Sequence, residues 1–463
     1  MSDPKPTKPA PTSFQPPRGT RDFYPIEMAR RLWLEDKWRR TAVRHGFDEI
    51  DGPTFEHLDL YTVKSGEGII SELFSFSRAG GETPFALRPE FTPTLARMVA
   101  TKANALPKPI KWFSIGPYFR AERPQRGRLR EFLQWNVDSL GDPSPEADAE
   151  VIACCVDGLR AMGLTPNDVR LNINDRHFMQ SAMNVFGIEE QLHDQVFQWL
   201  DRRSKVSTTE TDIRAKELGI PESFDDFVVL GRIQALTAPL SPMAFKKQLE
   251  STFSGLAFTI QGLASFQSLW DRLDDAGVVE WCGLSTGIVR GLAYYTGTVF
   301  EVHETTGAER AIAGGGRYDN LVELFGGAPT PAVGFAMGDV VISLVLQDKG
   351  LMPSDDDIAR DLGLAPDAFI LPASDDADAL VLRPLLAALR RQGLHARRSY
   401  KSTRNVGKLL QDADKARARY AVILESDTRA QLKDLSSKEQ HEVVANDLAS
   451  LATALAERIA PPR

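Results

Sequence analysis

Two apolar runs on either side of an arginine-rich loop constrain the fold of this chain more than any other feature. The runs are IKWFSIGPYF before the loop and FLQWNV after it. Pro124 and Gly127 stand in the middle of the loop and break any helix there. The pattern therefore predicts two strands joined by a long loop.

The loop has a composition that suits phosphate binding. A guanidinium group offers a planar fork that grips a phosphate at two places. The charged residues of the loop are Arg120, Arg123, Arg126, Arg128 and Arg130, interleaved with Glu122 and Glu131. Several arginines on one loop suggest a polyphosphate, a nucleic-acid end, or both. The alternative is a solvated surface hairpin whose charges serve solubility.

Length and composition set the class of protein. At 463 residues the chain is too long for one ordinary core, so we expect two or three domains. Its apolar share of 42% and charged share of 25% are those of a soluble globular protein. The net charge of −8 argues against a protein that coats nucleic acid without sequence selectivity, because such a protein would be basic overall. No apolar run reaches membrane-spanning length, so we expect no membrane partner.

The cysteines and the first residues indicate a cytoplasmic location. Cys154, Cys155 and Cys282 show no zinc spacing, so we predict no metal site of protein origin. The adjacent pair lies in an apolar run and fits a core, and no disulfide framework is implied, which suits a reducing cytoplasm. Residues 1–16 are rich in proline and lack the apolar part of a signal peptide, so we expect a disordered tail.

Local patterns predict the remaining organisation. Apolar residues recur at helical spacing over 27–45, and FSF with FALRP predicts a hairpin before a helix that begins near Thr92. Residues 176–277 show helical patterns without a motif, which indicates a mainly helical insertion. Residues 351–366 have the composition of a linker. Residues 367–463 alternate strand and helix patterns, which predicts a small α/β domain with a mixed sheet.

A region rich in glycine and tyrosine follows the insertion. LSTGIVRGLAYYTGTVFEVHE (284–304) predicts a turn and then a strand, with Arg290 and the Tyr294–Tyr295 pair just before the strand. AIAGGGRYDNL (311–321) contains three glycines that allow a backbone to approach a ligand closely. The alternative for these glycines is a bend between core strands.

Together these segments resemble the histidyl-tRNA synthetase family. The stretch 119–141 resembles motif 2 of the class II aminoacyl-tRNA synthetases, and its ERPQRGR run is most similar to the histidine member. RGLAYYTG and GGGRYD resemble the two signature motifs of that family, and LLQDADKARARYAVIL resembles its C-terminal domain. The resemblance covers nearly all of residues 17–463 except the insertion.

The resemblance implies an α/β (α+β) fold. A catalytic domain built on an antiparallel sheet of the class II type would comprise 17–175 and 278–350, interrupted by the helical insertion 176–277. After the linker, 367–463 would form an α/β anticodon-binding domain. The helix over 27–45 and the strand after it resemble motif 1, which implies a homodimer.

The implied activity is the ATP-dependent ligation of histidine to tRNA. The histidine carboxylate attacks the α-phosphate of ATP and releases pyrophosphate, and the terminal adenosine of the tRNA then takes the acyl group. The implied partners are L-histidine, ATP with Mg²⁺, tRNA(His) and a second copy of the chain.

The resemblance also implies roles for single residues. Arg120 and Arg290 would be the catalytic cations at the α-phosphate. The residues implied to bind ATP are Arg120, Glu122 at the adenine amine, Arg128 at the γ-phosphate and Phe132 stacked on adenine. The residues implied to bind histidine are Glu90, Phe91, Thr92, Arg120, Gln134, Asp138, Arg290, Tyr294 and Tyr295. Within this set Glu90 would pair with the α-ammonium and Asp138 would accept the imidazole N–H. Taken singly, Glu90 and Asp138 could be surface acids and Tyr294 a core residue.

Two groups of residues would meet tRNA. Gln125 and Arg126, at the tip of the arginine loop, would contact the acceptor end. The residues implied to contact the tRNA backbone are Arg397, Arg398, Lys401 and Arg404. The alternative for this second group is a solvated basic edge.

Several positions depart from the family pattern. Val340 and Val341 stand where motif 3 has a Glu-Arg pair, whose arginine covers adenine and reaches the γ-phosphate. Ala293 replaces the Asp of RGLDYY, and Phe91 replaces a smaller residue of some members. Either another arginine substitutes at motif 3, or ATP binding is weak, or the chain belongs to a diverged subgroup.

Two other functions stay open. One is a synthetase-like regulatory paralogue of histidine biosynthesis, which binds histidine without activating it. Such paralogues generally lack the anticodon-binding domain and often lose motif 2 arginines, both of which this chain keeps. The other is a tRNA-binding protein without catalysis, against which Glu90, Arg120 and Arg290 argue.

Overall fold

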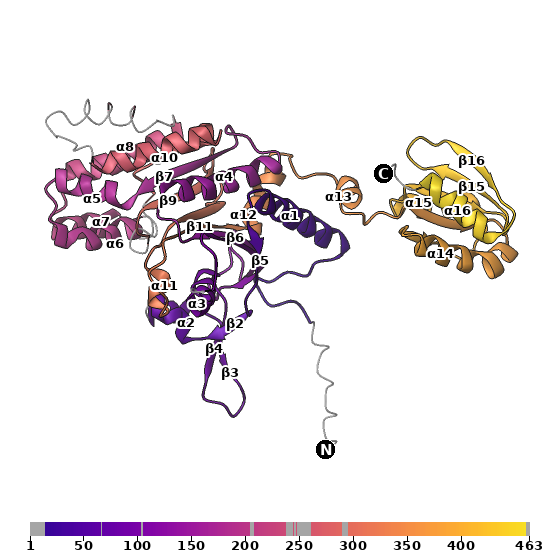
Figure 1. The fold of residues 1–463 in the computed structure, drawn as a ribbon, viewed down its shortest axis with the longest axis horizontal. Helices are drawn as coiled ribbons and strands as arrows, with labels where there is room; N and C mark the ends of the chain where they lie inside the picture. The colour runs from indigo at the N-terminus through magenta and orange to yellow at the C-terminus, as the bar shows by residue number, and fades with distance from the viewer. Residues whose placement is uncertain are drawn as a thin grey trace, which may run out of the picture. The chain divides into compact units, whose positions relative to one another are not determined.

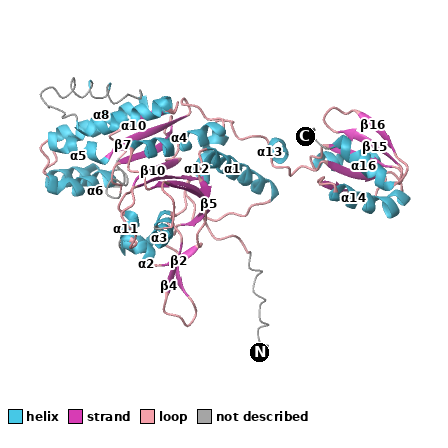
Figure 2. Ribbon diagram, in the orientation of Figure 1, coloured by secondary structure: helices cyan, strands magenta, loops and turns pink. Residues whose placement is uncertain are grey.

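The computed structural model describes residues 14–65, 67–102, 105–203, 208–237, 244, 247, 261–288 and 295–459. The chain divides into two compact units (Figures 1 and 2). The larger unit comprises Met1–Asp22 and Leu34–Met352, and the C-terminal unit comprises Phe23–Trp33 and Pro353–Arg463. None of the described helices combines the length and the apolar character needed to cross a bilayer.

Eight of the described strands form the main sheet of the larger unit, in the order β1-β5-β6-β11-β10-β9-β7-β8. They are β1 Asp48–Glu49, β5 Ile110–Phe119, β6 Glu131–Leu140, β7 Val169–Asp175, β8 Cys282–Leu284, β9 Thr298–Glu304, β10 Ala313–Arg317 and β11 Ala332–Gly338. The pairings from β5 through to β7 are antiparallel, and the edge strands β1 and β8 pair in parallel. The predicted antiparallel sheet is therefore confirmed, and β5 and β6 are the strands predicted around the arginine loop.

Helix α4 (Pro145–Ala161) packs against β6 and β11 and closes the core of the larger unit. Gly158 permits this close packing, because a Cβ there would lie 2.7 Å from the ring of Trp135. The indole of Trp135 also stacks on that of Trp38 from helix α1 (Pro25–Arg44), with ring centroids 6.0 Å apart. The adjacent cysteines of α4 are fully buried, as predicted for core residues.

A second sheet of the larger unit has its described strands in the order β2-β4-β3. They are β2 Phe55–His57, β3 Ser75–Ser77 and β4 Pro84–Leu87. β3 and β4 pair in antiparallel fashion and form the hairpin predicted from FSF and FALRP. Helix α2 (Asp59–Ser65) follows β2, and helix α3 (Thr92–Lys102) begins at the predicted residue.

The described chain between β7 and β8 is helical. Its helices are α5 Arg176–Val185, α6 His193–Arg203, α7 Thr208–Glu217, α8 Glu222–Thr237 and α10 Gln261–Asp275. Their core is aromatic: ring centroids lie between 5.3 and 6.2 Å apart in contacts among Phe178, Phe186, Phe224, Phe227 and Phe266. These helices thus have a hydrophobic core of their own.

The C-terminal unit contains a mixed sheet whose described strands follow the order β13-β12-β14-β15-β16. Its elements are β12 Ala368–Pro372, α14 Leu382–Arg391, β13 Ala396–Arg398, α15 Val406–Lys415, β14 Tyr420–Leu424, β15 Arg429–Asp434, β16 Gln440–Val444 and α16 Leu448–Ile459. β12 pairs in parallel with β13 and β14, and β14, β15 and β16 pair in antiparallel fashion. The predicted mixed sheet is confirmed. Strand β16 was missed because it is largely exposed and lacks alternating apolar residues.

The segment expected as a linker contains helix α13 (Asp355–Asp361). The hydroxyl of Ser354 accepts a hydrogen bond of 3.2 Å from the Asp357 N–H, which caps the helix start. The acidic residues of the first turn favour the positive end of the helix dipole. Residues 354–357 (SDDD) are therefore the start of a helix, and Arg30 binds Asp355 at 2.8 Å within the same unit.

Candidate active site

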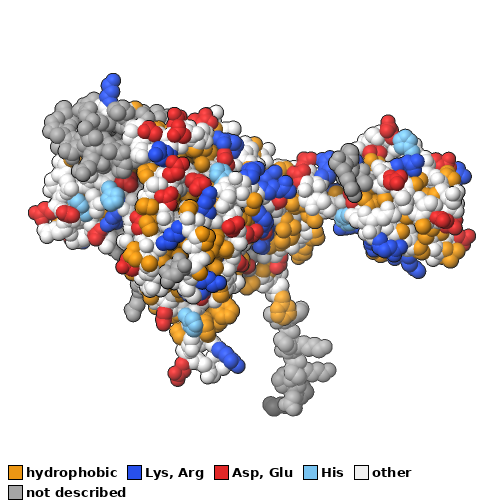
Figure 3. Space-filling model, viewed as in Figure 1, with side chains coloured by type: hydrophobic (Ala, Val, Ile, Leu, Met, Phe, Trp, Pro, Cys, Tyr) orange, Lys and Arg blue, Asp and Glu red, His pale blue; other side chains and the backbone are white. Residues whose placement is uncertain are grey.

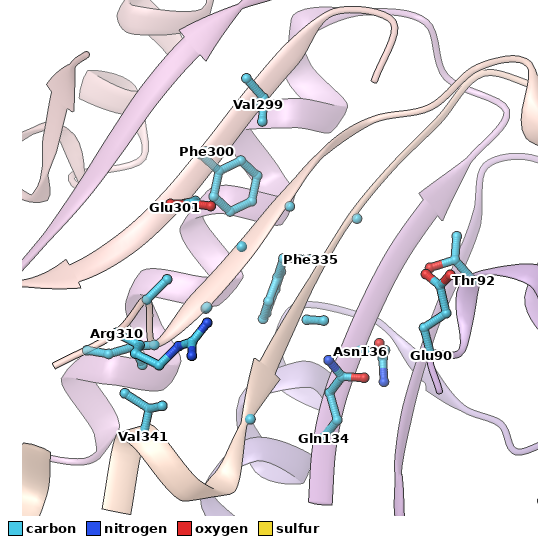
Figure 4. Close-up of a pocket in the computed structure, with 18 of the residues that line it drawn as sticks. Glu90, Thr92, Gln134, Asn136, Val299, Phe300, Glu301, Arg310, Phe335 and Val341 are labelled. Carbon is cyan, nitrogen blue, oxygen red and sulfur yellow. The ribbon is translucent and has the colours of Figure 1, made fainter. Parts of the chain in front are cut away.

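A cavity of about 1200 Å³ opens against the main sheet of the larger unit (Figure 4). Residues of β6, β9, β10 and β11 and of the arginine loop line it. In Figure 4, Glu90 and Thr92 lie on one side of the cavity and Arg310 and Val341 on the other. Segments far apart in the sequence thus share one cavity.

Strand β6 supplies the polar residues at the centre of the cavity. Because alternate residues of a strand share a face, Phe132, Gln134, Asn136 and Asp138 all line it. Gln134, Asn136 and Asp138 are buried. Sequence analysis missed Asn136, although the same two-residue spacing points to it. Its amide donates a hydrogen bond of 3.1 Å to the hydroxyl of Tyr118.

Glycines of β10 and β11 make room for these side chains. A Cβ at Gly334 would lie 1.9 Å from Oδ1 of Asp138, and a Cβ at Gly315 would lie 2.2 Å from the carbonyl oxygen of Gly334. Neither position therefore accepts a larger residue. The glycines at 314–316 lie in strand β10 and pair with β9 and β11, so the alternative of a bend between strands is wrong.

Carboxylates and phenols gather at the end of the cavity near Asp138. The hydroxyl of Tyr318 donates a hydrogen bond to Oδ1 of Asp138. Tyr295 also lines the cavity, and burial raises the pKa of its phenol, with the carboxylates of Glu90, Asp138 and Glu301 adding to the rise. The phenol is therefore protonated at neutral pH. Such a set suits a ligand with an ammonium group and N–H donors.

Cations line the cavity where β6 meets the arginine loop. Arg120 and Arg128 are lining residues together with Phe132. The guanidinium carbon of Arg120 lies 5.3 Å from the ring centroid of Phe132, and Arg120 Nε donates to the carbonyl of Pro89 over 3.3 Å. Arg128 pairs with Glu122 at 2.9 Å. This end of the cavity suits an anion beside an aromatic ring.

The tip of the arginine loop is a closed turn. Gln125 and Arg128 exchange backbone hydrogen bonds of 3.0 and 2.9 Å. Arg126 is 62% exposed and binds Glu309 at 2.5 Å and Asp348 at 3.0 Å. Gln125 and Arg126 are not among the lining residues, so they lie at the rim of the site rather than inside it.

A buried ion pair holds the end of β10. Arg317 Nη2 lies 2.5 Å from Oδ2 of Asp148 on α4, and the two side chains are 9% and 4% exposed. Burial raises the pKa of Asp148, and the Arg317 guanidinium works against that rise. Arg317 also donates to the carbonyls of Asp142 and Ser144, each over 3.1 Å. Tyr318 follows Arg317 directly in the chain. The ion pair of Arg317 with Asp148 therefore also fixes the position of Tyr318, whose hydroxyl donates to the carboxylate of Asp138.

Comparisons with known proteins show the family of the chain. A family model described as histidyl-tRNA synthetase matches residues 19–339. A histidine–tRNA ligase of Opitutus terrae is 42% identical over 347 residues, which are 74% of this chain and 77% of that protein.

The chain belongs to the histidyl-tRNA synthetase family.

A second member, a histidine–tRNA ligase of Halobacterium salinarum, is 36% identical over 433 residues, which are 91% of this chain and 94% of that protein. Among solved structures of the family, the histidyl-tRNA synthetase of Nostoc sp. PCC 7120 superposes with a TM-score of 0.74 at 24% identity. That match covers 96% of this chain and 99% of the other.

One structural neighbour of the family carries two descriptions. It is an ATP phosphoribosyltransferase regulatory subunit/histidyl-tRNA synthetase from Bacillus halodurans, with a TM-score of 0.65 at 22% identity. The match covers 87% of this chain and 97% of the other. At such identities the structural matches concern the fold alone.

The cavity gathers many of the residues that the family resemblance implies for histidine. The lining residues among them are Glu90, Thr92, Arg120, Gln134, Asp138 and Tyr295. Phe91 is not a lining residue: it is 1% exposed and packs in a buried cluster with Leu95 and Tyr118. Arg290, Ala293 and Tyr294 lie outside the described residues.

Sequence analysis missed several further residues that line the cavity. They include Asn136, Glu301, His303, Arg310 and Tyr318. Glu301 and His303 share a face of β9, and the Nε2 of His303 lies 2.8 Å from Oε2 of Glu301. Tyr318 lies within the GGGRYD segment, where the sequence pattern pointed only to the glycines. Nothing in the sequence pattern singled out Arg310.

In the C-terminal unit, two of the basic residues implied to contact tRNA are held by aspartates. Arg404 and Lys401 bind aspartates at 2.9 and 2.5 Å. The guanidinium carbon of Arg398 lies 4.6 Å from the ring centroid of Tyr400, which is 85% exposed. Arg397, the preceding residue of β13, is exposed, and its Nε donates to Nε2 of His395 over 3.0 Å. Arg398 and Tyr400 therefore present charge and an aromatic ring close together.

Proposed function

We propose that the chain is a histidine–tRNA ligase that activates L-histidine with ATP and transfers it to tRNA(His). The observation that carries the proposal is the course of β6, which leads from Phe132 at the arginine loop to Asp138 among the carboxylates and phenols. The six residue steps span roughly 20 Å. A nucleotide at one end and an amino acid at the other would therefore meet along one strand face.

The Asp138 end supports selection of histidine. The Asp138 carboxylate accepts the imidazole N–H, and Tyr318 fixes the orientation of that carboxylate. Glu90 pairs with the α-ammonium, and Thr92 and Gln134 add hydrogen bonds. A side chain without an N–H donor would leave a buried carboxylate unpaired, which is a strong basis for rejection.

The arginine end supports activation by ATP. Adenine stacks on Phe132, with Glu122 near its amine, and Arg120 and Arg128 bind the phosphates. An oxygen of the histidine carboxylate attacks the α-phosphorus, the bond to the bridging oxygen breaks, and pyrophosphate leaves. Arg120 stabilises the charge that develops on the transferred group. Arg290 is proposed as the second cation, from a segment outside the described residues.

Magnesium enters as part of the nucleotide. Across the described part of the chain, no three His, Cys, Asp or Glu side chains are grouped so that they could hold a metal ion. Mg²⁺ would be held by phosphate oxygens, water and one or two carboxylates at most, which is the common mode for this ion. The substrate is accordingly written as MgATP.

Transfer to tRNA follows activation. The hydroxyl of the terminal adenosine attacks the histidyl carbonyl carbon, and AMP leaves with the electrons of the broken bond. Gln125 and Arg126 at the rim contact the acceptor end, and Arg126 exchanges its carboxylate partners for phosphate. Arg397, Arg398 and Tyr400 contact tRNA through the C-terminal unit, where an exposed ring can stack on an unpaired base.

A cytoplasmic homodimer completes the proposal. Phe55, Val63 and Phe76 of the β2–β4 region are 50%, 52% and 44% exposed. Figure 3 shows hydrophobic side chains gathered over this part of the larger unit. A second copy of the chain would cover such a surface.

Aminoacylation tests the proposed function. The purified chain is incubated with labelled histidine, ATP and either a tRNA(His) transcript or a transcript for another amino acid. Charging of tRNA(His) alone supports the proposal. Histidine binding without charging would favour the regulatory paralogue, a function that the valine at position 341 in place of the family arginine also favours.

A further inference from the structure

Arg310 lies beside a position where the family pattern has an arginine and this chain has Val341. Both residues line the cavity. Both also approach the loop tip, because a Cβ at Gly127 would lie 3.6 Å from Cδ of Arg310 and 3.4 Å from Cγ2 of Val341. In Figure 4 the guanidinium of Arg310 turns into the cavity, on the side opposite Glu90. An arginine thus reaches this place from a different segment.

The charges around Arg310 suit an anion. The neighbouring carboxylate of Glu309 is held by Arg126 at 2.5 Å, which compensates its charge. Arg128 lines the same part of the cavity and adds a further cation. Val340 and Val341 also line it and have no polar side-chain atoms. The positive charge that would bind an anion here therefore comes from Arg128 and Arg310.

We propose that Arg310 binds the β- and γ-phosphates of ATP and substitutes for the arginine absent from position 341. The proposal rests on the proposed function and names a residue of its ATP site. The planar fork of the guanidinium can donate two hydrogen bonds to one phosphate group. The short valine leaves room for that side chain, whereas two arginines side by side would repel each other.

Nucleotide binding measured by calorimetry without histidine tests the proposal. Arg310→Ala weakens ATP binding about tenfold to a hundredfold, the worth of a charged hydrogen bond, and changes AMP binding less than about twofold. Arg310→Gln keeps most of the volume, loses the charge and shows the same selective loss. Arg310→Lys keeps the charge and retains part of the ATP affinity. The matched control is Arg214→Ala on α7, an arginine that is 51% exposed and outside the cavity lining.

Two results would overturn the proposal. One is unchanged ATP affinity in Arg310→Ala and Arg310→Gln. The other is an equal loss for ATP and AMP in variants that unfold at the wild-type temperature, because Arg310 would then act on the nucleoside. If the wild type activates no histidine but needs Arg310 for ATP, the proposed function fails and this inference stands. If it activates histidine without needing Arg310, only this inference fails.

Discussion

The hydroxyl of Tyr318 donates a hydrogen bond to the carboxylate of Asp138 and so joins the segment after β10 to the C-terminal part of β6. Both residues are buried, with 3% and 6% of their surface exposed. A neutral phenol fixes the orientation of the carboxylate without neutralising it. The GGGRYD segment therefore acts on the proposed histidine end of the cavity.

Tyr318→Phe should weaken histidine binding selectively. The variant removes one donor from a buried carboxylate, a loss of roughly 1.5–3 kcal/mol. This loss corresponds to a rise of about tenfold or more in the KM for histidine in ATP–pyrophosphate exchange. We expect the KM for ATP to change less than about twofold. An equal rise in both KM values would contradict a role for this phenol at the histidine end.

Gly334→Ala should disturb the same carboxylate through sterics alone. The added methyl would lie 1.9 Å from Oδ1 of Asp138 and 2.8 Å from the carbonyl oxygen of Val137, so the side chain or the strand must shift. We expect a loss of about 1–3 kcal/mol in the free energy of unfolding from urea denaturation. Gly338→Ala on the same strand is the control, because a Cβ there meets no atom within 4 Å. Equal free energies of unfolding for the two variants would contradict this expectation, because the strand would then accommodate the methyl group at position 334 without cost.

Asp148→Asn should destabilise the larger unit strongly. The change leaves the buried Arg317 guanidinium with only the more distant carboxylate of Asp319, 3.3 Å away, and the loss of a buried partner costs about 3–5 kcal/mol. Asp157→Asn on the same helix is the control, since Asp157 is 33% exposed and its pairs with Arg160 and His45 should each be worth about 1 kcal/mol or less. Urea denaturation of both variants measures the difference. A loss no larger than that of the control would mean that water or another group satisfies Arg317.

The ion pairs of Lys349 should make stability depend on pH. Lys349 binds Glu304 at 3.0 Å and Asp168 at 3.5 Å. Burial alone would raise the pKa of both carboxyls, but hydrogen bonds, including those from Lys349, hold the pKa of each below its usual value. A carboxyl with a lowered pKa in the folded state stabilises the fold above its unfolded pKa, and that contribution is lost as the pH falls through the folded value.

Lys349→Met should therefore lower the free energy of unfolding by roughly 1–3 kcal/mol at pH 7. The deficit relative to the wild type should shrink as the pH falls below about 4.5, because the wild type loses its advantage there. Urea denaturation at several pH values between 7 and 3 measures it. A deficit that stays constant across this range would assign the effect to packing of the lysine stem instead.

Arg126→Ala should weaken tRNA binding. Arg126 is 62% exposed, and its pair with the 58% exposed Asp348 should contribute less than about 1 kcal/mol to folding, whereas its partner Glu309 is only 5% exposed. We expect an unchanged KM for histidine, together with a higher KM for tRNA and a weaker dependence of that KM on salt. Unchanged kinetics with tRNA would remove Arg126 from the proposed acceptor contact.

Local pattern was sufficient for the elements that dominate the fold. The apolar runs around the arginine loop predicted β5 and β6, and the family resemblance pointed to Gln134 and Asp138, which share one face of β6. The strand and helix alternation after residue 367 likewise gave the mixed sheet of the C-terminal unit. In both cases short apolar runs bounded by loop or helix patterns mark the buried strands in the sequence itself.

Contacts between segments that are distant in the sequence leave no local pattern that would predict them. Tyr318 and Asp138 are 180 residues apart and meet only through the register of β6, β11 and β10. Arg310 lies in no motif and reaches the cavity through the course of the chain before β10. Phe91 shares the LRPEFT segment with Glu90, yet its ring packs into the core, because neighbouring residues of one segment can face opposite ways. Motif membership therefore does not decide which side chain lines a site.

Histidine-dependent ATP–pyrophosphate exchange on the purified chain, with every other standard amino acid as a control, tests the central claim most directly. The account predicts exchange with histidine alone, because Asp138 and Tyr318 select the imidazole and the arginines bind the triphosphate. Histidine binding without exchange would contradict it, and the chain would then bind histidine without activating it.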